Sequence, residues 1–204
     1  MDPAALLIFA ATLFVAAASP GPGIAAIVAR VLGRGLNGAV AFTAGIALGD
    51  VVWLTIAVLG LAAVAHTFHG VLLAIKYAGV VYLLYLAYRL WTQAVEAREV
   101  VAETSTDHPV RLFLAGLAVT MGNPKVMVFY LALLPSLIDL QAVTLLGWLE
   151  LSAVTLSVLA VVFGSYVLLA ARTRTLFTSP RAIRMVNRGT GAVMASAAVA
   201  IAAK

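Results

Sequence analysis

The sequence contains no cysteine and few charged residues, and each absence excludes whole classes of protein. Without cysteine in its 204 residues, the chain has no disulfide framework, no thiolate nucleophile and no cysteine-based metal site. Only 10% of the residues are charged and 64% are apolar. A soluble domain is about one quarter charged and about half apolar. The composition therefore excludes a soluble enzyme, a disordered tail and a secreted disulfide scaffold.

Motifs for catalysis and metal binding are also missing. The three histidines, His66, His69 and His108, lie in expected loops and are too few and too scattered for a metal site. No phosphate-binding loop, nucleophile elbow or zinc-binding helix motif is present, and the basic loops carry no nucleic-acid module. We therefore expect no catalytic residue, no cofactor, no bound metal and no nucleic-acid partner.

Long apolar runs dominate what remains. A membrane-spanning helix needs ~20 residues, and the alternating polarity of a membrane β-barrel is absent, so the runs predict an all-α membrane protein. The opening Met1-Asp2-Pro3 lacks the positive start of a secretory signal, so the first run is expected to stay in the membrane. The expected spans are residues 6–32, 39–65, 71–93, 111–136, 142–171 and 187–203.

The arginines of the connecting loops predict how these spans are oriented. Alternate loops carry almost all the positive charge, and the other connections carry only Lys76 and, at the end, Lys204. Because cytoplasmic loops are enriched in Lys and Arg, we expect the basic loops in the cytoplasm and both termini outside. The arginines on this side are Arg30, Arg34, Arg89, Arg98, Arg111, Arg172, Arg174, Arg181, Arg184 and Arg188.

A polar linker at residues 94–110 divides one membrane domain, residues 1–204, into two parts. We expect repeat one at residues 1–93 and repeat two at residues 111–204, each with three spans. An odd number of spans per part makes the second repeat inverted relative to the first. The linker itself is interpreted as a solvated connector.

Both repeats contain a proline-rich interruption in their first span, so helices one and four are expected to be broken. Proline removes a backbone N–H and clashes with the preceding turn. Paired breaks in corresponding places indicate a transporter binding site near the middle of the bilayer, although two simple packing kinks are the alternative. The residues at the breaks are Ser19, Pro20, Gly21, Pro22 and Gly23 in span one, and Gly122, Asn123, Pro124 and Lys125 in span four.

Apart from Lys76 and the arginines near the span ends, three charges lie within the apolar spans. Asp50 and Lys125 are both expected near mid-bilayer, where an unpaired charge is costly, so they predict a buried pair. The pair is either a static salt bridge or a site that meets substrate or a proton, with Asp50 as the candidate proton carrier. Glu150 is expected nearer the outer surface, as an outer gate, a second proton site or a hydrated wall residue.

The order and spacing of these motifs resemble the LysE/RhtB translocators, which are small bacterial inner-membrane exporters of amino acids and their derivatives. The resemblance covers essentially the whole chain. The motifs that carry it are Ser19-Pro20-Gly21-Pro22, Gly45-x-x-x-Gly49-Asp50, Lys76-x-x-Gly79-x-x-Tyr82-Leu83, Gly122-Asn123-Pro124-Lys125 and Asn187-Arg188-x-x-Gly191.

The resemblance implies efflux of a small zwitterion by a homodimer in the lipid bilayer, driven by the proton motive force. In that interpretation the half-helix N-termini hold the carboxylate of the cargo and Asp50 faces its ammonium group. Lys125 assists the carboxylate or holds Asp50 when the site is empty. Ser19 and Asn123 supply polar contacts, and one repeat rocks against the other.

Three other functions remain open from the residues. The first alternative is a transporter of another small solute or of a metal cation, but cation sites favour clustered carboxylates and here the acids are few. The second alternative is a membrane-embedded enzyme that acts on lipid, but the histidines that could serve such an enzyme all lie in loops. The third alternative is a purely structural helix bundle, which would leave the costly breaks and charges unexplained.

Overall fold

The computed structural model describes residues 1–61 and 108–172, with single positions between 77 and 92 and between 188 and 199. The expected third and sixth spans lie almost wholly outside the described residues. The same holds for most of the linker, for Lys76, His66, His69 and Lys204, and for the motif positions at Gly79, Asn187 and Gly191.

The described part of the chain is helical and contains no strand, as the composition predicts. Its helices are α1 (Pro3–Ala18), α2 (Pro22–Arg34), α3 (Ala39–Ile56), α6 (Pro109–Met121), α7 (Pro124–Val128), α8 (Leu134–Leu137) and α9 (Leu145–Arg172). Two π-helical turns, η1 (Ala57–Leu61) and η2 (Phe129–Leu133), extend α3 and join α7 to α8, and a 3₁₀ turn, η3 (Leu140–Ala142), precedes α9.

Two helices are long and apolar enough to cross a membrane unbroken, Ala39–Gly60 and Leu145–Arg172. Two further candidates are bent pairs: Pro3–Ala18 with Pro22–Arg34, at 55°, and Pro109–Met121 with Pro124–Leu137, at 56°. The described residues therefore hold two to four candidate spans. The expected breaks in helices one and four are confirmed.

Proline chemistry explains where each break falls. Helix α1 ends at Ser19 before Pro20, and Pro22 begins α2 at a position where its missing N–H costs no hydrogen bond. In the second broken span α6 ends at Gly122, and Pro124 begins α7 in the same way. The side chain of Asn123 caps α7 by accepting a hydrogen bond from the Lys125 amide at 3.1 Å.

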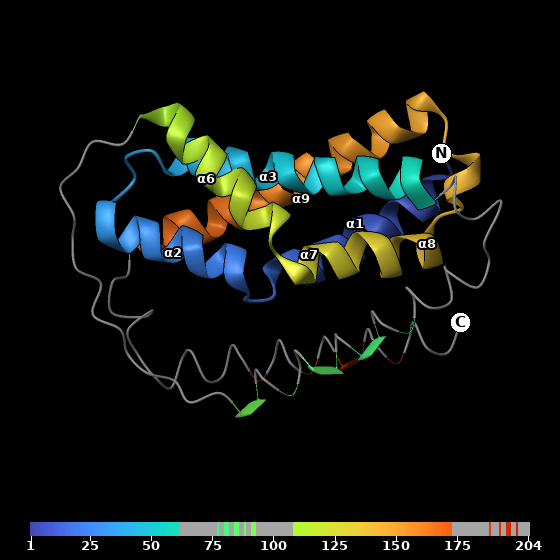
Figure 1. Ribbon diagram of the computed structural model, residues 1–204, viewed down its shortest axis with the longest axis horizontal. Coiled ribbons are helices and arrows are strands. Elements are labelled where there is room, and N and C mark those ends of the chain that lie inside the picture. Colours follow the sequence, from blue (N-terminus) through green and yellow to red (C-terminus); the bar gives the residue numbers. More distant parts are fainter. Residues whose placement is uncertain are drawn as a thin grey trace.

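The described helices run along the long axis of the molecule (Figure 1). One end holds the N-terminus and the start of α9, and the other holds the α2–α3 connection, the start of α6 and the end of α9. The two broken spans therefore run in opposite directions. Arg34 ends α2, Arg111 lies in the first turn of α6 and Arg172 ends α9, so these arginines share the end opposite the N-terminus.

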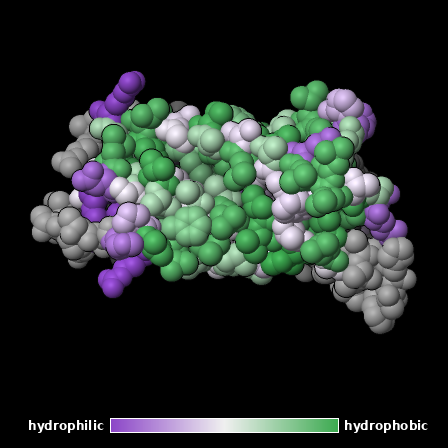
Figure 2. Space-filling model, turned by 90° about the horizontal axis from the view of Figure 1, so that it is seen from above, coloured by the Kyte–Doolittle hydropathy of each residue, from purple (hydrophilic) through white to green (hydrophobic). Residues whose placement is uncertain are grey.

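The surface between the two ends is apolar, and hydrophilic residues gather at the ends (Figure 2). Exposed side chains along this middle zone include Leu48, Leu114, Leu156 and Val161. A broad apolar band between polar ends is the surface that a lipid bilayer covers.

Helices α3 and α6 pack backbone to backbone through glycine. A Cβ added at Gly45 would lie 1.9 Å from the carbonyl oxygen of Phe113, and one added at Gly116 would lie 2.0 Å from that of Phe42. Gly49 similarly faces Thr120. The glycines of the Gly45-x-x-x-Gly49 motif therefore form a close helix contact, which holds the segment that carries Asp50 against α6.

Candidate functional site

The two helix breaks lie against each other, and the side chain of Lys125 connects them. Its Nζ donates a hydrogen bond of 2.6 Å to the backbone carbonyl of Ser19 and lies 3.4 Å from the Ser19 hydroxyl. A Cβ added at Gly21 would lie 3.4 Å from the same Nζ. The structure thus brings Ser19, Gly21 and Lys125 together, although they come from opposite halves of the chain.

The break in the first span leaves carbonyl groups at the end of α1 that need new donors. The Tyr166 hydroxyl of α9 donates to the carbonyl of Ala18 at 2.7 Å, and Lys125 donates to that of Ser19. The last carbonyls of a helix also carry partial negative charge, which favours a cation there. Lys125 therefore has both a hydrogen-bonding and an electrostatic reason to lie at this point.

The first backbone amides of α2 donate no hydrogen bond to a capping side chain, unlike those of α7. Its N-cap, Gly21, supplies no side-chain hydrogen bond, whereas Asn123 caps α7. The first amides of α2, at Gly23 and Ile24, therefore carry partial positive charge without a side-chain cap, and the Lys125 ammonium lies close by. The arrangement suits a carboxylate.

Asp50 is buried on α3 and interacts electrostatically with Lys125, but the two do not form the direct pair that their similar depth predicts. Within the described residues, the ion pair that the structure holds is at the end of the molecule and involves neither side chain. The two charges therefore interact at longer range, and the static salt bridge, one of the two expected alternatives, is not formed between these two residues. The ammonium binds the carbonyl released by the helix break, a partner that side-chain charges alone do not reveal.

Two further contacts hold the backbone around Asp50. The Thr120 hydroxyl of α6 donates to the Ile46 carbonyl at 3.0 Å, and the Trp53 indole N–H donates to the Thr120 carbonyl at 3.3 Å. Both contacts bridge α3 and α6 on either side of Asp50. They position the carboxylate between rigid helices.

Sequence reasoning missed three buried hydroxyl groups, of which the Tyr130 hydroxyl lies beside Asp50. Tyr130, in the π-helical turn η2, is fully buried, and its hydroxyl faces both the Asp50 carboxylate and Thr155 of α9. Ser152 lies one turn before Thr155 on the same helix face and is also buried. The available signal was weak, since it consists of two hydroxyl residues three apart in an apolar span.

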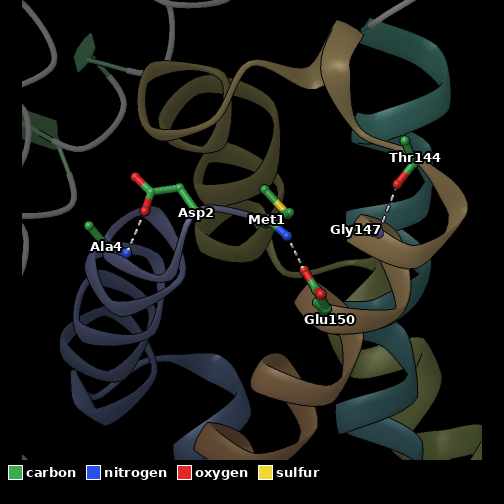
Figure 3. A network of polar contacts seen from close by, with 6 residues as sticks. All are labelled: Met1, Asp2, Ala4, Thr144, Gly147 and Glu150. Atoms are coloured by element: carbon green, nitrogen blue, oxygen red, sulfur yellow. Dashed lines mark hydrogen bonds and ion pairs between the residues drawn. The ribbon is translucent and has the colours of Figure 1, made fainter.

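Glu150 lies at the end of the molecule, next to the start of the chain (Figure 3). Its carboxylate is 2.6 Å from the Met1 ammonium, and its side chain is 32% exposed. It projects from a different face of α9 than Ser152 and Thr155. The neighbouring contacts are local ones, between Asp2 and the Ala4 amide and between Thr144 and the Gly147 amide.

Two adjacent helix breaks, with a lysine at one of them and a buried aspartate on a neighbouring helix, are features of membrane transport proteins. In the described part of the chain, no three His, Cys, Asp or Glu side chains group as a metal site would require. The model of the LysE type translocator family matches residues 14–204, and the chain therefore belongs to that family.

Two bacterial efflux proteins are similar to the chain along most of their length. The homoserine/homoserine lactone efflux protein of Salmonella typhimurium is 32% identical over 86% of this chain and 84% of its own. The leucine efflux protein of Klebsiella pneumoniae is 24% identical over 90% of this chain and 87% of its own. No solved structure matches the chain.

Proposed function

We propose that the protein exports amino acids or small amino acid derivatives across the bacterial cytoplasmic membrane. Membership of the translocator family, together with relatives named for homoserine and leucine efflux, supports the cargo class. The observation that carries the proposal is the contact between the two breaks, made by the Lys125 ammonium on the Ser19 carbonyl at 2.6 Å.

In the proposed site, the two charged ends of a zwitterion meet two different regions. The carboxylate binds Lys125 and the uncapped start of α2, where Pro20, Gly21 and Pro22 turn the chain. The ammonium group binds the carboxylate of Asp50. Asn123 and Pro124 start the opposite half-helix, and the Ser19 hydroxyl adds a polar contact.

The proposed cycle is alternating access between two inverted repeats of three helices, with helices one and four broken. Two features support it: similar bends of 55° and 56°, and opposite directions of the two broken spans. Cargo carboxylate competes with the Ser19 carbonyl for Lys125, so binding loosens the link between the breaks. Asp50 carries the coupling proton, and Glu150 is a second proton site near the outer end. From the family resemblance we propose a homodimer, and from the loop arginines we propose that both termini lie outside.

Growth protection tests the cargo class directly. Cells that express the protein are exposed to a panel of inhibitory amino acids and analogues, and export of each protective compound is then measured. We expect protection and faster efflux for at least one amino acid. Protection against divalent cations, with no amino acid exported, would instead support the alternative of a cation transporter.

A further inference from the structure

Three buried hydroxyl groups near Asp50 lack the hydrogen bonds that hydroxyls elsewhere in the molecule make. By distance and angle the Tyr130 Oη, Ser152 Oγ and Thr155 Oγ1 atoms form no hydrogen bond among the described residues, although the Tyr130 hydroxyl is close enough to Asp50 and Thr155 to interact with both. Tyr130 and Thr155 have no exposed surface, and Ser152 is 7% exposed. Buried polar groups are nearly always satisfied, so three such groups in one region need an explanation.

Other hydroxyl groups in the apolar helices do form hydrogen bonds, so the lack of them at these three residues is not a general property of helices. Thr12, Thr43, Thr55 and Ser165 each donate to the backbone carbonyl four residues earlier, at 2.7 to 2.8 Å. Ser165 lies on the same helix, α9, as Ser152 and Thr155. A hydroxyl in a helix normally satisfies itself in this way, and Ser152 and Thr155 do not.

The three hydroxyls are also near one another and near the candidate ammonium site. Tyr130 faces both Asp50 and Thr155, and Ser152 is one helical turn from Thr155. They belong to two elements, η2 and α9. A cargo whose ammonium lies at Asp50 and whose carboxylate lies at Lys125 would direct its side chain toward a third position.

We propose that Tyr130, Ser152 and Thr155 form the subsite for the cargo side chain and select amino acids with a hydroxyl or similar polar side chain. This inference rests on the proposed export function. The hydroxyls gain hydrogen bonds when such a side chain enters, and they remain unsatisfied when an aliphatic side chain enters. A site built to hydrogen-bond a hydroxyl rejects the analogue that lacks it more strongly than an apolar pocket does.

Access to the subsite requires movement, because two of its residues have no exposed surface. Separation of the breaks, with Lys125 leaving the Ser19 carbonyl, opens the region between α7 and α9. The same link that binds the cargo carboxylate therefore also controls entry of the cargo side chain.

The test uses two cargoes of nearly equal shape, L-homoserine, which has a terminal hydroxyl, and L-norvaline, which has a methyl group there. Liposomes that contain the purified protein are loaded with each amino acid, and the ratio of the two initial efflux rates is measured. Wild type is expected to favour homoserine by a factor of ~10 or more. In Tyr130→Phe and Thr155→Val, which keep side-chain shape, the ratio is expected to fall toward one because homoserine efflux slows more than norvaline efflux.

Matched controls are Ser165→Ala and Thr43→Val, whose hydroxyls bond to local carbonyls. Both are expected to keep the wild-type ratio. Ser152→Ala, the smallest change in the subsite, decides the question if either larger variant fails to fold by size-exclusion chromatography.

Three results would overturn the inference. If wild type exports norvaline as fast as homoserine, the subsite is wrong while amino acid export stands. If the variants lose both cargoes equally together with dependence on a pH gradient, the hydroxyls serve proton movement instead. If wild type exports no amino acid at all, the proposed function fails as well.

Discussion

Lys125 shows how much a helix break changes the partner of a buried charge. Its position in the sequence and that of Asp50 predict two opposite charges at one depth, and the structure does bring them into electrostatic range. The direct hydrogen bond, however, goes to a backbone carbonyl. Such carbonyls are exposed only where a helix ends, so the partner depends on backbone geometry that charge patterns do not contain.

Replacing Lys125 by methionine removes the proposed carboxylate partner and keeps the length of the side chain. A hydrogen bond to a charged group contributes about 1.5–3 kcal/mol, which corresponds to roughly 10- to 100-fold in binding. We therefore expect Lys125→Met to weaken competition by an exported amino acid by about that factor. Competition by the corresponding amino acid amide, which has no carboxylate, should change little. An equal loss for both compounds would contradict the assignment.

Replacing Asp50 by asparagine removes the proposed proton carrier without changing its shape. In liposomes we expect Asp50→Asn to lose acceleration of amino acid efflux by an imposed pH gradient. Asp139→Asn is a matched control, because Asp139 is exposed and only caps the turn at Gln141. Full acceleration in Asp50→Asn would show that another group couples transport to protons.

The sequence identified some site residues and missed others for a physical reason. Asp50 and Lys125 are conspicuous because a charge in an apolar run is costly. Tyr130 is not conspicuous, since an aromatic residue in a membrane span is ordinary. Its role near Asp50 depends on the π-helical turn that redirects it, and no local sequence feature announces that turn.

At the scale of helices, the breaks were predictable and the closeness of α3 to α6 was predictable only in part. Proline inside a helix removes a hydrogen bond and clashes with the preceding turn but is tolerated at the first helical position, so Pro22 and Pro124 locate both breaks. The glycines of span two predict a close neighbour. Which helix it is depends on tertiary packing, in which Gly116 of α6 meets the backbone of Phe42.

This contact predicts a sharp difference between two Gly→Ala substitutions. In Gly45→Ala the new Cβ would lie 1.9 Å from the Phe113 carbonyl oxygen, so α3 and α6 must separate. We expect a destabilisation at or above the upper end of the usual range for overpacking, about 3 kcal/mol. In Gly164→Ala, where the Cβ meets open space, we expect no loss and up to ~1 kcal/mol of gain. Thermal unfolding of the purified variants in detergent measures both.

The whole molecule has polar ends and an apolar middle, and its described arginines gather at one end. The all-helical class followed from apolar runs of sufficient length, and the described residues hold two to four candidate membrane spans where such runs lie. Which end faces the cytoplasm is not a property of the isolated fold, because it follows from the membrane and its insertion machinery. It therefore stays a prediction from the loop arginines.

The absence of native cysteine makes this orientation directly measurable. Asn37→Cys places one thiol in the exposed α2–α3 connection, and Gln141→Cys places one in the exposed turn before α9. In intact cells, a thiol reagent that does not cross membranes should label Gln141→Cys and leave Asn37→Cys unlabelled until the cells are opened. The reverse pattern would invert the proposed topology.

Protection of a thiol at the break itself tests the central claim most directly, namely that the two breaks together hold the cargo. Gly21→Cys points a side chain at Lys125 and is compatible with the extended backbone there. We predict that an exported amino acid slows its alkylation by N-ethylmaleimide and leaves alkylation of Gln141→Cys unchanged. If saturating cargo has no effect on the thiol at position 21, the cargo does not bind between the breaks.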